Sequence, residues 1–380
     1  MSTPVYRTRV DNIDGLNESE RRELKRVEEM YAFRANDYYL SLIDWDDPDD
    51  PIRRIILPDP RELEPWGVLD ASAESTYTKT SGLQHKYEQT ALLLVSDVCG
   101  GFCRYCFRKR LFMDSNRETV RDMDPDLAYI RDHPEITNIL LTGGDPLILS
   151  TARLESIIHK LRQIEHVRVI RIGSKIPAFN PYRIINDPSL LALIRTYSTE
   201  QRRIYIMTQF THQKELTDIA IDGIDLLIKA GAILANQTPL LRGINDDPGV
   251  LGDLLRSLSF IGVPPYYVFQ CRPTRGNRHF VVPVEEGYGI FEQAKALCSG
   301  LAKRPRLIMS HQTGKIEVVG VDERHVYFKY HQAAKREDIG KFMVYRRNPQ
   351  ACWFDDYTEG LYESRVGSGI FPGRLPLPAQ

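Results

Sequence analysis

Six short apolar runs, rich in β-branched residues, alternate with longer amphipathic stretches between residues 86 and 300. The runs are residues 91–95, 138–141, 167–172, 203–207, 232–237 and 266–270. The stretches between them, such as 154–164 and 219–230, carry apolar residues at helical spacing. Strands and helices that alternate in this way predict βα units around a parallel sheet. Because six units are too few for a closed eight-stranded barrel, we expect an α/β fold with a partial, open (β/α)6 barrel, or else a doubly wound sheet.

The two ends of the chain have different patterns. Residues 18–42 mix charged and apolar positions near helical spacing, and the acidic, proline-rich run 44–51 ends the pattern, which predicts a helical N-terminal extension over 1–85. Residues 306–309, 316–321 and 325–330 alternate like antiparallel strands. We therefore expect three parts: the extension (1–85), the barrel (86–300) and a small β-containing C-terminal cap (301–380).

The composition is that of a globular protein with a small partner. Hydrophobic residues make up 42% of the chain and charged residues 27%, and the formal net charge is -1. A chain with this balance of charges has no net electrostatic attraction to nucleic acid or anionic lipid. The sequence has no run of about 18 apolar residues and no apolar signal core at its start. We therefore expect a cytoplasmic protein that binds neither nucleic acid nor membranes.

Three of the six cysteines fall within eight residues, directly after the first predicted strand. Cys99, Cys103 and Cys106 have the spacing CxxxCxxC, and three thiolates on one tight loop can hold three irons of a [4Fe–4S] cluster. A structural zinc site would need a fourth nearby Cys or His, which the loop lacks, and an odd number of cysteines does not suit disulfides. The pattern predicts an iron–sulfur cluster and no zinc.

Polar residues follow the predicted strands. Ligands of parallel α/β sheets bind at the carboxyl ends of the strands, so these residues are expected to surround one site. The residues at or just after strand ends include Cys99, Gly143, Gly144, Asp145, Ser174, His212, Gln237 and Arg272.

Five segments together carry a resemblance to a known family. They are HKYEQTALLLVSDVCGGFCRYCFRKR, LLTGGDPLILS, RIGSKIPAFNPYRI, LANQTPLLRGIND and PPYYVFQC, in order over residues 38–280. The chain resembles the lysine 2,3-aminomutase family of radical S-adenosylmethionine (SAM) enzymes. The resemblance implies that the amino and carboxylate groups of SAM chelate the fourth iron, and that one electron from the cluster cleaves SAM to a 5′-deoxyadenosyl radical. It also implies a flavodoxin-type or ferredoxin-type electron donor, and homo-oligomers are typical of the family.

The resemblance assigns residues to SAM. Gly143, Gly144 and Asp145 would approach the amino group of its methionine part, and a plain turn is the alternative interpretation. Ser174, His212 and Gln237 would contact its carboxylate and ribose. His212 lies in a loosely matching segment, and for it an N-cap or surface histidine is the alternative.

The family also implies pyridoxal 5′-phosphate (PLP), held as a Schiff base on a lysine. Lys315, preceded by Gly314, is the lysine in a comparable setting, although the usual glycine-rich run before it is shortened. The alternative is a lysine in a hairpin turn. For the PLP phosphate the family has two basic residues upstream of the cysteines, and here Lys86 occupies the first position and Thr90 the second.

Two arginines bear on the substrate. Arg108 matches the family arginine that binds the substrate α-carboxylate, and a surface arginine is the alternative. At the position of Arg272 the lysine enzymes have an aspartate that pairs with the substrate ammonium, and residues 308–310 lack the second expected carboxylate. Since a cation there repels a lysine side chain, we expect an acidic or neutral-polar substrate, unless Arg272 points outward.

The sequence therefore predicts an isomerase, a PLP-dependent radical SAM 2,3-aminomutase that moves an α-amino group to the β-carbon of an amino acid. One alternative is a radical SAM enzyme of the same fold without PLP, which abstracts hydrogen from another substrate. A second is lysine 2,3-aminomutase itself. A non-enzymatic iron–sulfur electron carrier fits less well, because it would not need the polar strand ends.

Overall fold

Six parallel strands form the centre of the protein, and their order in the sheet follows the chain. They are β5 (Thr90–Ser96), β6 (Asn138–Gly143), β7 (Val169–Ser174), β8 (Ile204–Thr208), β9 (Ile233–Leu240) and β10 (Pro265–Gln270). The computed structural model describes residues 3–113, 116 and 118–364. All six predicted strands are confirmed to within three residues at either end. The order lacks the reversal that a doubly wound sheet requires.

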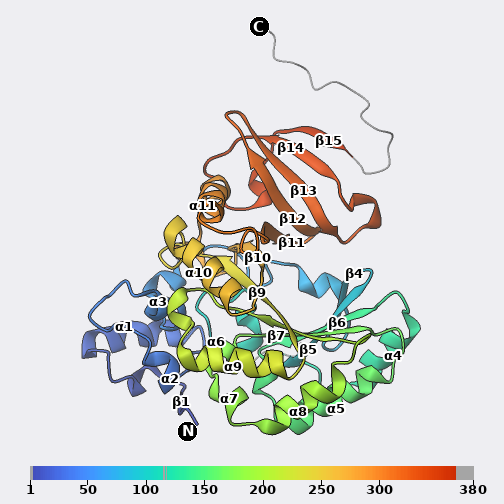
Figure 1. Cartoon of the computed structure of the whole chain (residues 1–380). Helices are drawn as coiled ribbons and strands as arrows, with labels where there is room; N and C mark the ends of the chain where they lie inside the picture. The colour runs from blue at the N-terminus through green and yellow to red at the C-terminus, as the bar shows by residue number, and fades with distance from the viewer. Residues whose placement is uncertain (1–2, 114–115, 117, 365–380) are drawn as a thin grey trace.

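Amphipathic helices connect these strands and bury their apolar sides. In α5 (Thr151–Arg162) the buried residues Leu154, Ile157, Ile158 and Leu161 follow the three-and-four spacing of one helix face. Figure 1 shows α5, α8 and α9 side by side below the sheet. The remaining helices of this part are α4 (Asp124–Asp132), α6 (Ile176–Phe179), α7 (Tyr182–Ile185), α8 (Pro188–Tyr197), α9 (Asp218–Lys229), α10 (Pro248–Phe260) and α11 (Val284–Ala296).

The sheet continues on both sides and stays open, with β3 and β15 at its ends. The strands β12 (Gly314–Val321), β13 (His325–Ala333), β14 (Phe342–Arg346) and β15 (Gly360–Ser364) are antiparallel, as expected for the cap, and lie above the parallel strands in Figure 1. The first predicted cap strand, β11 (Arg306–His311), pairs antiparallel with β12 as expected, and on its other side it pairs parallel with β10. The expected cap is therefore an extension of the central sheet. Its residues 365–380 lie outside the described part of the chain.

The N-terminal part is less helical than predicted. The helix expected over 18–42 splits into α1 (Glu18–Glu28) and α2 (Asp37–Leu40), because β2 (Ala35–Asn36) pairs with β1 (Tyr6–Arg7) between them. A third helix, α3 (Pro51–Ile56), follows the acidic run, and β3 (Thr78–Thr80) and β4 (Leu83–Tyr87) join the edge of the central sheet. None of the helices within the described ranges is both long and apolar enough to span a bilayer.

Candidate active site

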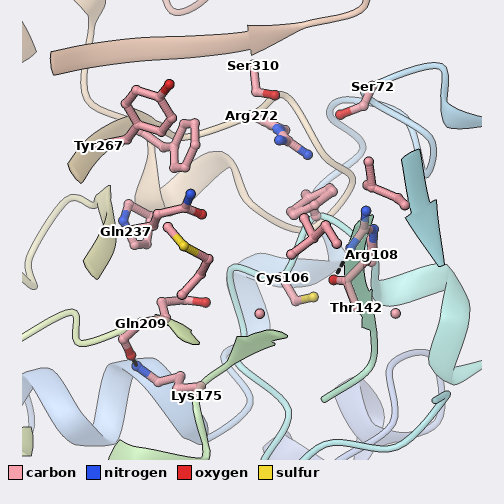
Figure 2. Close-up of a pocket in the computed structure, with 18 of the residues that line it drawn as sticks. Ser72, Cys106, Arg108, Thr142, Lys175, Gln209, Gln237, Tyr267, Arg272 and Ser310 are labelled. Atoms are coloured by element: carbon pink, nitrogen blue, oxygen red, sulfur yellow. Dashed lines mark hydrogen bonds between the residues drawn. The ribbon is translucent and has the colours of Figure 1, made fainter. Parts of the chain in front are cut away.

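A cavity of about 340 Å³ lies at the carboxyl ends of the parallel strands, enclosed by the cysteine loop and the C-terminal strands (Figure 2). This volume is within the range of small-molecule sites, about 300–1,000 Å³. Of the site residues predicted from the sequence, His212 does not line the cavity. The others do: Lys86, Cys99, Cys103, Cys106, Arg108, Gly143, Gly144, Asp145, Ser174, Gln237, Arg272 and Lys315.

The three cysteines of the loop 99–106 border this cavity without meeting at one point. Among the described residues, no three His, Cys, Asp or Glu side chains lie close enough to share a single metal ion. A cubane cluster does not require that, since each cysteine binds a different iron. Burial raises the pKa of all three thiols, that of Cys103 to about 12, so metal binding has to displace their protons. The donor set fits an iron–sulfur cluster.

Gly143 and Gly144 bring the end of β6 against the cysteine loop. Gly143 has φ +115°, and a Cβ atom on Gly143 or Gly144 would lie 2.4 Å from the carbonyl oxygen of Ser96 or Val98, respectively. The amide of Gly144 donates to the oxygen of Ser96 at 2.6 Å, and that of Asp145 donates to Val98 at 2.8 Å. The glycines are therefore required by backbone packing as well as by any ligand.

A Gly144→Ala variant is expected to lose about 1–3 kcal/mol of unfolding free energy, because its methyl group would overlap the Val98 backbone. It should also load less iron, since Val98 precedes Cys99. Gly289→Ala is the matched control: that glycine lies inside α11 with open space around it, so alanine should stabilise by about 0.5–1 kcal/mol. Urea unfolding and iron content measure both effects, and equal behaviour of the two variants would contradict this packing role.

The side chains of Asp145 and Ser174 are hydrogen-bonded to each other. The Ser174 hydroxyl donates to Asp145 Oδ2 at 3.0 Å, and the same oxygen accepts the amides of Lys175 at 2.7 Å and Ile176 at 3.1 Å. Burial raises the pKa of Asp145 to about 6, although these hydrogen bonds oppose the shift. The carboxylate thus ties the end of β6 to the end of β7, which leaves backbone carbonyls as the better partners for a ligand ammonium group.

The two remaining predicted SAM residues differ in their placement. Gln237 lies in the cavity wall (Figure 2). The imidazole of His212 instead caps the 3-10 helix Gln213–Glu215, where its Nδ1 accepts the amide of Lys214 at 3.1 Å. This geometry matches the alternative interpretation of His212 as an N-cap, and its ligand role stays a prediction.

Four cations lie in and directly after the cysteine loop, at positions 104, 108, 109 and 110, and two glutamates of the N-terminal part pair with them. Glu62 is fully buried and accepts from Arg104 at 2.7 and 2.9 Å and from Lys109 at 3.0 Å. Glu74, from the 3-10 helix Glu74–Tyr77, pairs with Arg108 at 2.7 Å and with Arg110 at 2.6 Å. These two glutamates were not predicted from the sequence. A buried basic run requires carboxylates, but the sequence pattern does not show which segment supplies them.

Arg272 follows β10 and faces the cavity. Its guanidinium carbon lies 3.5 Å from the centre of the Phe107 ring, and its Nη1 is buried without a hydrogen-bond partner in the described structure. Burial lowers the pKa of Arg272 to about 10, although Glu74 opposes the shift. Figure 2 shows the guanidinium below Ser310. The inward orientation makes Arg272 available to an anionic ligand.

Lys315, at the start of β12, has no carboxylate partner in the part of the chain that the structure describes. Its amine lies 4.7 Å from the centre of the Tyr87 ring. Burial lowers the pKa of Lys315 well below its ordinary value, and the charges of Arg171, Lys86 and Arg272 lower it further. A neutral amine is the nucleophilic form of lysine, so the residue suits covalent attachment of an aldehyde.

Lys86 lies on β4 and connects the N-terminal part with the turn before Lys315. Its amine donates to the carbonyl oxygen of His311 and lies 5.2 Å from the centre of the Tyr77 ring. Burial, and then repulsion by Arg272, lowers the pKa of Lys86 to about 7. Arg171 points inward from β7. Together with Lys86 and Arg272 it gives this end of the cavity an excess of positive charge.

Comparison with known proteins adds an independent line of evidence. The family model of the radical SAM superfamily matches residues 93–251. A putative L-lysine 2,3-aminomutase of Aquifex aeolicus (strain VF5) is 58% identical over 360 residues, which cover 94% of this chain and 96% of the relative. The chain belongs to the lysine 2,3-aminomutase family of radical SAM enzymes.

Two other relatives of this family differ in their named substrate. The L-lysine 2,3-aminomutase of Clostridium subterminale is 39% identical over 69% of this chain and 62% of its own length. The glutamate 2,3-aminomutase of Clostridioides difficile is 33% identical over 76% of this chain and 67% of its own length. Proteins named 2,3-aminomutases are isomerases, so the predicted enzyme class is confirmed. Membership of the superfamily also supports the cluster and SAM as cofactors.

Proposed function

We propose that this protein is a PLP-dependent radical SAM aminomutase, and that its substrate is an amino acid with an acidic or neutral-polar side chain. The observation that carries the proposal is the presence of Lys315, Arg272 and the three-cysteine loop on one cavity. The sequential order of the parallel strands supports the partial (β/α)6 barrel that such chemistry uses.

The residues divide the cavity between the cofactors. Cys99, Cys103 and Cys106 would hold the cluster, and the Gly143–Gly144 backbone with Ser174 and Gln237 would hold SAM. Lys315 would hold PLP, and Lys86 its phosphate. When bound, the cluster and SAM supply an organic radical, and PLP supplies a π-system that stabilises a radical beside the migrating nitrogen. The chain itself binds and orients the substrate and keeps water from the reacting atoms.

The charges of the cavity favour an anionic side chain over an ammonium group. Its acidic wall residues are Glu74 and Asp145, and both are already occupied by protein partners. Among the described residues Arg272 has no such partner, and Phe107 holds its guanidinium within the cavity. Like-charge repulsion would disfavour lysine, whereas a carboxylate or amide could accept from the free Nη1.

Two alternatives remain, each with its own support. The names of several relatives favour lysine as the substrate, and the radical SAM match by itself would suit an enzyme without PLP. Turnover of L-lysine compared with L-glutamate distinguishes the first alternative from the proposal. PLP binding to the protein distinguishes the second.

An Arg272→Met variant tests the substrate proposal. Removing one partner of a buried charge pair costs about 2 kcal/mol or more, so kcat/KM for L-glutamate should fall at least about 30-fold, while that for L-lysine should stay the same or rise. Arg275→Met is the control, because Arg275 is exposed and lies outside the cavity wall. Preferred turnover of L-lysine by the unaltered protein would overturn the proposed substrate class.

A further inference from the structure

The segment 70–77 before β3 forms part of the cavity wall, although it lies far in sequence from the cysteines. Ser72, Glu74 and Tyr77 border the cavity. The Asp70 carboxylate accepts the amide of Glu74 at 2.9 Å, and Ala73 is the one non-glycine residue with positive φ (48°) in the described structure. A strained backbone held by such a hydrogen bond is the kind of geometry that fixes a functional side chain. Here the side chain that it fixes is Glu74.

Glu74 grips one side of the Arg108 guanidinium. The Nε of Arg108 donates to both carboxylate oxygens at 3.1 Å, and Nη2 donates to Oε1 at 2.7 Å. On another side, Nη1 donates to the hydroxyl of Thr142 at 2.8 Å, the bond drawn in Figure 2. A guanidinium has five N–H bonds, and these contacts use three of them. One N–H on each terminal nitrogen is left for a ligand.

A second arginine holds the Glu74 carboxylate in place. Arg110 donates to Glu74 Oε2 at 2.6 Å, and Arg110 is held in turn by Glu118 at 2.8 Å. Burial by itself would raise the pKa of Glu74, but the two guanidinium groups lower it to about 2, so the carboxylate stays charged. Glu74 and Arg108 are 8% and 7% exposed, which leaves little freedom for either side chain.

We propose that Glu74 is a positioning residue: it orients Arg108 so that the two free N–H bonds meet the α-carboxylate of the amino acid. This inference rests on the proposed function, in which Arg108 binds that carboxylate. Bidentate recognition depends on the angle of the guanidinium plane as well as on its charge. Without Glu74, Arg108 would keep its charge but lose this orientation.

The test compares each amino acid with its decarboxylated analogue. PLP-loaded protein is titrated with L-glutamate and with 4-aminobutyrate, and in parallel with L-lysine and cadaverine, and the absorbance of bound PLP reports each Kd. The variants are Glu74→Gln, Glu74→Asp and, as matched control, Glu118→Gln, which removes the other carboxylate bound by Arg110 and keeps the Glu74–Arg108 pair. Thermal unfolding of each variant shows whether it is folded.

We expect the unaltered protein and Glu118→Gln to prefer the amino acid over the amine. Glu74→Gln should weaken amino acid binding by about 10- to 100-fold and change amine binding less than about threefold, and Glu74→Asp should lie between. A purely structural role would weaken both ligands alike, and that result, or full retention of the preference, overturns the positioning role. If Glu74→Gln does not fold, the same comparison of amino acid and amine binding is made with Glu74→Asp.

The outcome also separates this inference from the proposed function. In one outcome, the unaltered protein binds PLP and forms a β-amino acid, and Glu74→Gln still prefers the amino acid over the amine. This outcome overturns the role of Glu74 and leaves the proposed function intact. Unaltered protein that binds no PLP overturns both.

Discussion

A Lys315→Met variant is expected to retain no covalently bound PLP and to lose at least about 100-fold in β-amino acid formation, about 2.7 kcal/mol in barrier height. Lys315 combines an amine with no carboxylate partner in residues 3–113, 116 and 118–364, a pKa lowered by burial, and a position on the same cavity as the cysteines. Methionine has a similar length but no nucleophile. Borohydride reduction followed by peptide mass spectrometry shows which lysine carries PLP in the unaltered protein.

Two comparisons make this prediction specific. Lys329→Met, on the neighbouring strand β13 with its side chain exposed, should retain PLP and activity. Lys86 is the other cavity lysine with a lowered pKa, to about 7. If borohydride fixes PLP on Lys86, the assignment of Lys315 is wrong, and Lys315 becomes a residue of the hairpin.

The second large effect is expected at the cysteines. A Cys106→Ala variant should bind little iron after anaerobic reconstitution and cleave SAM at a rate near background. Changes around a metal site that spare the ligands already cost about 10- to 100-fold, so loss of a ligand should cost at least that much. Iron and sulfide content, the electron paramagnetic resonance of the reduced protein, and 5′-deoxyadenosine formation measure the loss.

Cys298→Ala provides the matched control. Its thiol is buried in the core around α10 and α11, where it contacts the carbonyl oxygens of Gly252 and Ala294, and it does not border the cavity. This variant should load a normal cluster with only a modest loss of stability. A Cys106→Ala protein that still forms the cluster and cleaves SAM would contradict the role given to the CxxxCxxC loop.

The central sheet could be predicted because each parallel strand is a continuous apolar run. Periodicity and length also identified α5 and α9. Two other strands were harder to predict: β2 is two residues long and interrupts a helical pattern, and β11 has the same alternation whether its neighbour is parallel or antiparallel. Short or edge strands depend on partners that are distant in sequence, which local patterns do not reveal.

A position on the cavity wall could be predicted for residues at strand ends, such as Ser174 at the end of β7 and Arg272 just after β10, while their ligand roles stay predictions. What escaped prediction were contacts between distant segments. Glu74 contacts Arg108 from a segment with no periodicity, and Lys175 pairs with buried Glu215 at 2.6 Å. For His212, proximity to a strand end did not reveal that the ring caps a 3-10 helix.

The most direct test of the proposed function is a product assay on the unaltered protein. Anaerobically purified protein with a rebuilt cluster, PLP, SAM and a reductant is incubated with single amino acids, including L-glutamate, L-glutamine and L-lysine, and mass spectrometry detects the β-isomers. We expect a β-amino acid from an acidic or neutral-polar substrate. Cleavage of SAM to 5′-deoxyadenosine without PLP binding or any isomerised amino acid would contradict the aminomutase proposal.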